Sequence, residues 1–300
     1  MRDMNGYFNI MKPTGMSSAA VVAVMRRLTG EKRTGHAGTL DPEAAGVLPI
    51  MTGKATRLFD YLVDKEKEYE AVAAFGRSTD TQDATGKTLE TGDCYPDMNL
   101  VILKSQELIG NIRQKPSMYS AIKVGGRPLY DRARKGESVE VPERTVTVKQ
   151  IEVLGEEADH GMRLRIRCGK GTYIRTLCDD LGKKCGCPAH MRSLLRTQSG
   201  VFTLDTALTL DEARELAAAG RLAERMLPPD YPLMHLAAAE IDDAYGKQVH
   251  AGAKIPAGAC RMEVPEGENL RVYLKGAFWG IMRRENNQLI WKAQIAPENE

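Results

Sequence analysis

The densest group of chemically capable residues lies between Gly35 and Pro49, in the sequence GHAGTLDPEAAGVLP. One histidine, His36, and one aspartate, Asp41, stand there among glycines and prolines, which restrict the backbone that carries them. A carboxylate held in this way can act as a nucleophile or as a base. Aspartate before proline is also common turn chemistry, so this segment taken alone favours a structural role for both side chains.

Two further segments hold candidate side chains. In Gly169–Arg175, GKGTYIR, a basic strand is predicted to turn into the helix that spans residues 176–184. Tyr69 stands in the tripeptide Lys-Glu-Tyr at the start of an alternating, strand-like stretch. Each of these residues, taken singly, also fits an ordinary role as a packed ring or an exposed helix residue.

Basic residues gather between positions 163 and 196. This stretch holds nine Lys or Arg against two acids, whereas the whole chain carries a formal net charge of only +2. Any site for a polyanion must therefore be local, and this stretch is a candidate phosphate-binding face. The alternative is a solvated strand face followed by an exposed helix.

Apolar periodicity predicts a mixture of strands and helices without regular βαβ alternation, which favours an α+β fold with an antiparallel or mixed sheet. Ser17 or Ser18 is predicted to cap a helix that Gly30 ends, and residues 34–56 are predicted to be dominated by loops. The other predicted strands are 6–11, 68–75, 145–153 and 162–168, and the other predicted helical segments are 100–112, 131–136, 176–184 and 209–219.

A proline-rich segment, residues 228–232, predicts a linker between two domains, 1–231 and 232–300. Beyond it, strands are predicted at 270–275, 278–283 and 288–294, and Asn286-Asn287 supplies turn chemistry for the last hairpin. We therefore expect a small all-β C-terminal domain.

The composition is that of a globular protein, with 42% hydrophobic and 27% charged residues among 300. An apolar run of about 18 residues, which a membrane-spanning helix needs, is absent, and so is the pattern of a secretory signal. Six cysteines without such a signal predict free thiols in a reducing cytoplasm.

Together, in order and spacing, the segments resemble the bacterial TruB family of tRNA pseudouridine synthases, which act on uridine 55. The resemblance rests on several independent motifs in one order, which is more specific than any single match. Met11, before Lys-Pro, and Ala45 depart from the residues usual in the family. The motifs are Lys12–Ser18, Gly35–Pro42, Lys67–Tyr69, Pro116–Lys123, Gly171–Arg175, Asp179–Gly182 and Ala189–Arg196.

This resemblance implies a role for each candidate residue. Asp41 would be the essential carboxylate, with Arg175 against it, and Tyr69 would stack on the flipped base and handle the proton at C5. Tyr173 and Leu194 would line the same pocket, and His36 would help to occupy the gap that the base leaves. The implied contacts with the RNA backbone are Lys12, Arg163, Arg165, Arg167, Lys170 and Arg196.

The resemblance also implies an RNA-contacting insertion around residues 113–142 and a shortened PUA-like domain at the C-terminus. The implied partner is tRNA, bound through its T arm, in the cytoplasm. The isomerisation requires no cofactor and no metal, and neither a membrane nor an obligatory protein partner is implied.

Three alternatives remain at this stage. A glycoside-processing enzyme with an Asp nucleophile would need a second carboxylate as general acid, and no motif pairs one with Asp41. A non-catalytic RNA-binding protein would use the basic face without Asp41. A zinc site is the third alternative, although the spacing of its four residues is unusual for zinc. Its ligands would be Cys178, Cys185, Cys187 and His190.

Overall fold

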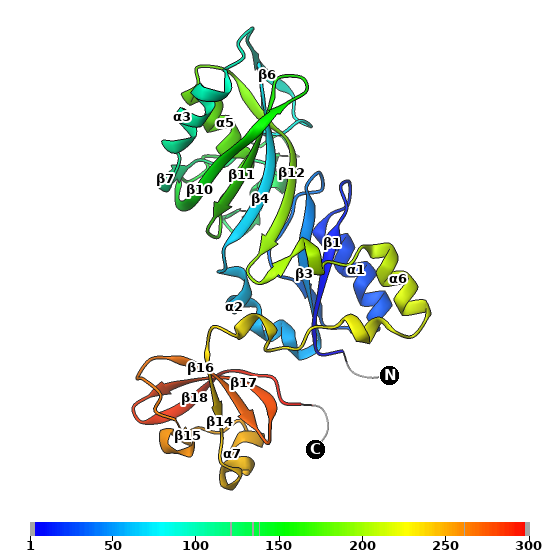
Figure 1. Ribbon diagram of the computed structural model, residues 1–300, viewed down its shortest axis with the longest axis vertical. Helices are drawn as coiled ribbons and strands as arrows, with labels where there is room; N and C mark the ends of the chain where they lie inside the picture. Colours follow the sequence, from blue (N-terminus) through cyan, green and yellow to red (C-terminus); the bar gives the residue numbers. More distant parts are fainter. Residues whose placement is uncertain (1–3, 121, 134, 138, 261, 298–300) are drawn as a thin grey trace.

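A computed structural model describes residues 4–120, 122–133, 135–137, 139–260 and 262–297. The molecule is elongated: a large sheet occupies one end and a smaller sheet, built from the C-terminal residues, the other (Figure 1). Two helices, α1 (Ser18–Thr29) and α6 (Leu210–Ala218), pack beside one edge of the large sheet. In the described ranges, the helices are too short or too polar to cross a membrane.

The large sheet has the order β1-β3-β12-β4-β11-β10-β7, with β2 paired to β3 and β13 to β12. Strands β3 and β12 run parallel, and the other pairs are antiparallel, which confirms the predicted α+β fold with a mixed sheet. Its strands are β1 (Gly6–Lys12), β2 (Thr34–His36), β3 (Ala45–Thr52), β4 (Lys67–Phe75), β7 (Gly110–Gln114), β10 (Arg144–Glu157), β11 (Gly161–Cys168), β12 (Ala189–Ser199) and β13 (Phe202–Thr203).

The two faces of this sheet differ because side chains alternate along each strand. Leu164 and Ile166 of β11 point into the main core, while Arg163, Arg165 and Arg167 lie on the opposite face. Helices α3 (Met98–Gln106) and α5 (Ile174–Lys184) cover the apolar face (Figure 1). The start of α5 is thereby fixed against the sheet.

Helix α1 begins after Ser17 and ends at Gly30, which confirms both predicted ends. The Ser17 hydroxyl accepts from the amide of Ala20 at 3.1 Å, and Gly30 ends the helix with a φ of 67°. Helix α6 begins with a capping box in which Thr209 and Glu212 satisfy each other's backbone amides. The segment 209–219 was predicted to be helical, and α6 confirms it.

Some predicted elements were wrong. Residues 34–56 hold β2 and β3 instead of a loop-dominated segment, because β3 is buried on both faces and therefore shows no alternation of polar and apolar residues. The helix predicted over 100–112 ends at Gln106, and Gly110, at a φ of 104°, precedes the rest of β7. Strand β12 was not predicted.

Residues 113–142, predicted as an insertion, join β7 to β10. They contain the hairpin β8 (Lys123–Val124) with β9 (Arg127–Pro128) and the short helix α4 (Leu129–Ala133). Ile122, Leu129 and Val141 form a small cluster there, against which Tyr173 packs. Three positions of this insertion lie outside the described residues: Ala121, which belongs to the Pro116–Lys123 motif, Arg134 and Ser138. A separate hairpin joins β5 (Arg77–Thr79) to β6 (Thr88–Thr91).

The C-terminal sheet has the order β14-β16-β17-β18-β15 and confirms the three strands predicted there. Asn286 and Asn287 form the last turn with φ values of 50° and 60°, as a two-residue hairpin loop requires. One short helix, α7 (Gly246–His250), accompanies the strands. The strands are β14 (Ala237–Glu240), β15 (Ile255–Pro256), β16 (Asn269–Leu274), β17 (Ala277–Glu285) and β18 (Gln288–Gln294).

A shared hydrophobic cluster joins the two sheets. Tyr7 and Leu58, near the N-terminal strands, pack in one cluster with Ile281 and Ile295 from the C-terminal sheet and the residues after it. Helix α2 (Phe59–Val63) also borders this junction. The segment predicted as a linker is itself packed here, since Pro232 is buried. The division between residues 231 and 232 stays a prediction.

The expectation of six free thiols was wrong for two cysteines. Cys94 and Cys187 form a disulfide, with their Cα atoms 5.7 Å apart. The fold brings the loop after β6 beside the turn that follows α5, a proximity that a separation of 93 residues hides in the sequence. The other four are free.

Candidate active site

A cavity of about 270 Å³ opens between the loop before α5, the start of β4 and the loop that follows β2. Seven of the predicted site residues line it: Asp41, Tyr69, Tyr173, Arg175 and Leu194, together with Lys170 and Arg196 from the predicted RNA contacts. The structure thus brings together side chains that lie more than 150 positions apart in the chain. His36 is not among the residues that line the cavity.

Asp41 is held by Arg175. The Arg175 guanidinium reaches from the first turn of α5, and its Nε lies 3.1 Å from Oδ2 of Asp41. The Asp41 side chain is 44% exposed, whereas that of Arg175 is 7% exposed. The carboxylate therefore combines a fixed orientation with access to a molecule in the cavity.

The other nitrogens of Arg175 are also held. Nη1 lies 3.2 Å from Oδ2 of Asp83 and donates to the Thr81 carbonyl, and Nη2 donates to the Tyr119 carbonyl at 2.9 Å. Tyr119 belongs to the 113–142 insertion, so this insertion helps to orient the guanidinium. Because its planar fork is bound on several sides, Arg175 has little freedom to rotate.

Asp83 is a functional candidate that the sequence analysis missed. Its Oδ1 accepts from the hydroxyls of Thr81 and Thr85 and from the Thr85 amide. Burial opposes ionisation, but these hydrogen bonds and the charge of Arg175 outweigh it and lower the pKa of Asp83 below its usual range. The residue stands in no recognisable motif, and a bridge to Met191 of β12 places its loop at the site.

The loop that carries Asp41 is fixed from two sides. The Ser18 hydroxyl accepts from the amide of Leu40 and donates to its carbonyl, both at 2.9 Å. Arg196 donates to the carbonyls of Gly38 and Val47. Gly46, at a φ of 114°, lies so close to the backbone of Arg196 that a Cβ there would clash. These contacts preorganise the carboxylate.

Lys12 and Arg196, which are predicted to contact RNA phosphates, are both buried in this structure. Lys12 is fully buried, and its Nζ donates to the carbonyls of Pro13, Met16 and Pro42. Arg196 is 1% exposed. Both cations instead bind backbone carbonyls around the Asp41 loop, because a buried charge requires such partners. Burial lowers the pKa of Lys12 to about 8.

The two tyrosines that line the cavity, Tyr69 and Tyr173, are both shielded from solvent. Tyr69 is 8% exposed, and burial raises the pKa of its hydroxyl, as it does for Tyr173. The backbone of Tyr173 is fixed by the buried side chain of Gln114, which accepts from its amide at 3.0 Å and donates to its carbonyl at 3.2 Å. Both phenols are therefore protonated at neutral pH.

His36 and Lys67 lie at the edge of this arrangement. His36 is in β2, its buried Nδ1 makes no hydrogen bond to the described residues, and burial followed by the Arg196 charge lowers its pKa. Lys67 lines the cavity, and burial lowers its pKa to about 8. Lys67 begins the Lys-Glu-Tyr motif, which was the available signal for it in the sequence.

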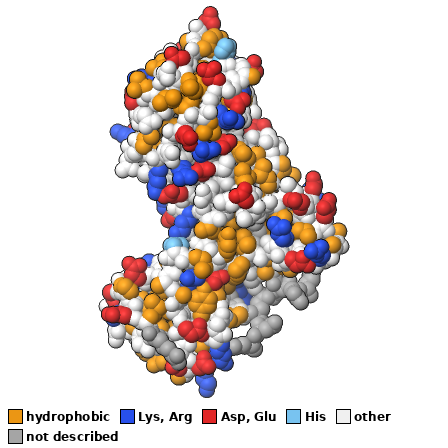
Figure 2. Space-filling view, in the orientation of Figure 1, with side chains coloured by type: hydrophobic (Ala, Val, Ile, Leu, Met, Phe, Trp, Pro, Cys, Tyr) orange, Lys and Arg blue, Asp and Glu red, His pale blue; other side chains and the backbone are white. Residues whose placement is uncertain are grey.

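The predicted phosphate contacts on β11 and after it are exposed but already paired. Arg165 contacts Glu70 and Glu152, Arg167 contacts Glu68, and Lys170 contacts Asp64. Arg163 lies 3.5 Å from Glu157. Figure 2 shows acidic and basic side chains next to one another over this part of the molecule. The excess charge of the sequence segment is thus balanced by acids from neighbouring strands.

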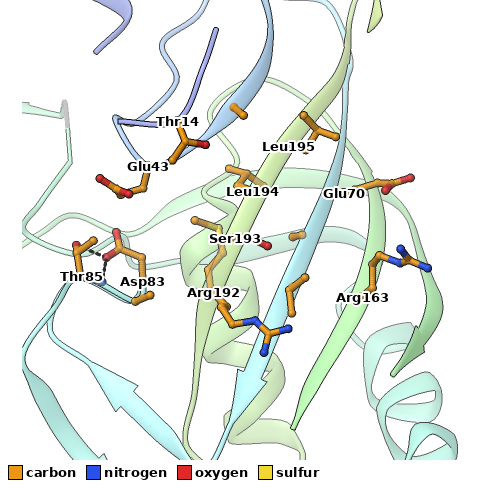
Figure 3. A pocket seen from close by; sticks show the side chains of 15 residues that line it. Thr14, Glu43, Glu70, Asp83, Thr85, Arg163, Arg192, Ser193, Leu194 and Leu195 are labelled. Atoms are coloured by element: carbon orange, nitrogen blue, oxygen red, sulfur yellow. Dashed lines mark hydrogen bonds between the residues drawn. The ribbon is translucent and has the colours of Figure 1, made fainter. Parts of the chain in front are cut away.

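A second pocket of about 370 Å³ adjoins the cavity (Figure 3). Leu194 lines both, so its side chain forms part of the partition between them. Asp83 also lines this pocket, beside Thr85, to which it is hydrogen-bonded. The Asp83 carboxylate thus reaches Arg175 from outside the cavity.

Two of the four residues of the zinc alternative have other partners. Cys187 is in the disulfide with Cys94, and Nδ1 of His190 lies 2.9 Å from the Arg77 carbonyl. Cys178 is buried, and burial raises its pKa to about 12, which opposes the thiolate form that binds metal. In the ranges that the structure describes, groups of three or more potential ligands are absent.

Comparison with known protein families identifies the family of this chain. Residues 26–174 match the TruB family pseudouridylate synthase N-terminal domain, and residues 175–234 match the tRNA pseudouridylate synthase B C-terminal domain. The chain belongs to the TruB family. The two matched TruB segments meet between Ile174 and Arg175, and the second ends at residue 234.

Relatives in the TruB family match over most of their length. A protein named tRNA pseudouridine synthase B from Alkaliphilus oremlandii is 42% identical over 95% of this chain and 95% of its own. One of the same name from Bacillus subtilis is 41% identical over 90% of this chain and 89% of its own.

Solved structures show the same TruB fold. A chain of a Cbf5–Nop10–Gar1 complex is 26% identical, with a TM-score of 0.72 over 99% of this chain and 84% of that chain. A chain of an H/ACA ribonucleoprotein bound to a substrate RNA containing 2′-deoxyuridine is 23% identical, with a TM-score of 0.75 over 98% of this chain and 86% of that chain.

Proposed function

We propose that this protein converts uridine 55 in the T arm of tRNA to pseudouridine, with Asp41 as the essential carboxylate. The observation that carries this proposal is the Asp41–Arg175 pair, in which an accessible carboxylate is fixed at a cavity lined by two tyrosines and a leucine. Membership of the TruB family, with relatives named tRNA pseudouridine synthase B, supports the substrate class.

The reaction breaks the bond between C1′ and N1 and forms one between C1′ and C5. The hydrogen on C5 is lost and N1 gains one, so atoms and electrons balance within the nucleotide and water. Asp41 would act on the nucleotide as nucleophile or base while Arg175 keeps it ionised and oriented. The cavity walls would hold the detached uracil while it turns.

A stacked uridine cannot reach Asp41, so the base must leave the RNA stack, at a cost of a few kcal/mol. Stacking on an aromatic side chain returns about 1–3 kcal/mol. Tyr69 lines the cavity together with Tyr173 and Leu194, which supports Tyr69 as the proposed stacking partner. Because its phenol is protonated, Tyr69 can accept the C5 proton only after it has given up its own, and we propose this as its second role.

The glycoside-processing alternative requires a second carboxylic acid, which would have to be protonated. The structure does supply a second carboxylate near Asp41, namely Asp83. Its lowered pKa and its contact with Arg175 make it an ionised acceptor and not an acid. A non-catalytic RNA-binding protein would not need the fixed, half-exposed Asp41. Both alternatives therefore fit the site less well.

Further residues have proposed roles in binding tRNA. His36 would help to occupy the gap that the flipped base leaves. Arg163, Arg165, Arg167 and Lys170 would exchange their carboxylate partners for backbone phosphates. We further propose that the protein acts in the cytoplasm, with a PUA-like C-terminal domain, and without cofactor, metal or obligatory protein partner.

The test uses purified protein and a tRNA transcript labelled with tritium at C5 of uridine. We expect tritium release and one new pseudouridine, at position 55, with wild-type protein and with Asp211→Asn, an exposed change on α6. We expect neither with Asp41→Asn or Asp41→Ala, although both bind the tRNA almost normally. Multiple turnover by Asp41→Ala would contradict the proposed role of Asp41.

A further inference from the structure

We propose that a pocket between the large sheet and the segment that leads to the C-terminal sheet binds one nucleotide of the RNA beside the target uridine. A phosphate of that nucleotide would lie on Lys65 and His235, and its base on an apolar floor. The proposal rests on the proposed function, because it takes the RNA substrate as the ligand. We call the site the junction pocket.

The junction pocket has a volume of about 400 Å³ and two kinds of wall. Leu62, Phe202 and Pro232 form part of an apolar floor, and Lys65, Gln198 and His235 stand among its polar residues. Ligand pockets are typically lined by apolar side chains with a few polar groups that fix the orientation of the ligand. A nucleotide, a planar ring that carries a charged group, matches both kinds of wall.

The charges around Lys65 show why it can take an external anion. The carboxylates on either side of it are already paired, Asp64 with Lys170 and Glu66 with Lys149. The Nζ of Lys65 instead lies 2.9 Å from Nε2 of His235. An ammonium can only donate, so the imidazole accepts and is neutral. Among the described residues, Lys65 has no carboxylate partner.

An incoming phosphate would change this pair. The phosphate could accept a hydrogen bond from the Lys65 ammonium. It could accept a second one from His235 after the imidazole has been protonated. Burial, the Lys65 charge and the charge of Arg271 on β16 all lower the pKa of His235, and Glu66 is the carboxylate on the pocket wall. A bound phosphate adds negative charge between Lys65 and His235 and so raises the pKa of His235. RNA binding should therefore be accompanied by protonation of His235.

The position of the pocket connects it to the RNA substrate. Val63 lines the active-site cavity, whereas Leu62 and Lys65 line the junction pocket. Ala37, beside His36 in the loop that leads to Asp41, also lines it. One short segment thus separates the two sites, so the pocket is within reach of a nucleotide next to a uridine whose base occupies the cavity.

The test compares full-length wild-type protein with Lys65→Gln, His235→Gln and the control Lys104→Gln, a lysine on α3 that does not line the pocket. We expect the first two to weaken binding of a T-arm RNA by roughly tenfold, the loss of one hydrogen bond to a charged group. Lys65→Gln should also lower the log–log salt slope by about 0.7–0.9. The kcat at saturating RNA should stay at the wild-type value.

The pH dependence separates this role from a structural one. Wild-type affinity for RNA should rise between pH 8 and pH 6 more than that of His235→Gln, and RNA should raise the pKa of His235 followed by NMR. Unchanged affinity and salt slope in both variants would overturn the proposal. A His235 signal that responds to inorganic phosphate but not to RNA would also overturn it, by assigning the pocket to a free anion.

The outcomes also distinguish this inference from the proposed function. If wild-type protein forms no pseudouridine but RNA binding still depends on Lys65 and His235, the function fails and the pocket stands. If wild-type protein forms pseudouridine and the two variants bind RNA normally, the pocket fails and the function stands.

Discussion

Nη1 of Arg175 lies 3.2 Å from Oδ2 of Asp83, a residue that precedes it by 92 positions. The same guanidinium holds Asp41 through Nε. Asp83 is itself fixed by two threonines, so the orientation of Asp41 depends on a chain of contacts that ends outside the cavity. This relationship leads to the first two predictions.

Replacing Arg175 with lysine keeps the charge but removes the planar fork. We expect kcat to fall by roughly 10–100-fold, because a flexible ammonium cannot hold Asp41 and Asp83 together in one geometry. Single-turnover kinetics at saturating tRNA measures this, with circular dichroism to check folding. Wild-type kcat in a folded Arg175→Lys protein would show that the pairing is unimportant.

Asp83→Asn removes one charge without a change of shape. We expect kcat to fall by about tenfold with little change in the Kd for tRNA, because Arg175 loses an ionic anchor but no contact with RNA changes. The matched control is Asp80→Asn, three residues earlier in the same loop. Equal kcat values for the two variants would contradict a positioning role for Asp83.

Asp83 should also affect stability at low pH. Its folded pKa lies below the unfolded value of about 3.9, so its contribution is complete above that pH and is lost as the pH falls through the folded pKa. The free energy of unfolding of the wild type should therefore fall more steeply below about pH 4 than that of Asp83→Asn. Urea titrations from pH 6 to pH 3 test this, and parallel curves would exclude it.

Ser18 and Ser17 form a matched pair. Ser18→Ala leaves the buried amide and carbonyl of Leu40 without their partner, so we expect a loss of about 1–3 kcal/mol in stability and a lower kcat. Ser17→Ala removes only the cap of α1 and should cost about 1 kcal/mol with kcat unchanged. Thermal unfolding and turnover at low temperature measure both. A normal kcat in Ser18→Ala would show that the Asp41 loop needs no support from this hydroxyl.

Arg165→Gln with Arg167→Gln tests the exposed face of β11. Both arginines are in exposed ion pairs, which contribute little, so stability should change by less than about 1 kcal/mol. If they exchange Glu70 and Glu68 for phosphates, the log–log salt slope of tRNA binding should fall by about 0.7–0.9 for each contact. An unchanged slope would leave both arginines as structural partners of the glutamates.

The sequence by itself determined the elements with a clear period and the motif-borne site residues. Helix α1 lies between the predicted Ser17 and Gly30, because cap chemistry is local. Asp41, Tyr69, Tyr173, Arg175 and Leu194 were found because their motifs stand in one order, and they share one cavity. Their roles in catalysis stay predictions.

Only the tertiary structure decided which charges are available and which are not. Lys12 and Arg196 look in the sequence like any other cations, yet both are buried against carbonyls, and Arg165 is balanced by acids from two neighbouring strands. Asp83 stands in no motif, and Cys94 meets Cys187 across 93 residues. The physical reason is common to all: charge pairing and burial depend on distances between strands and loops, and these distances arise from sheet order, which local periodicity does not encode.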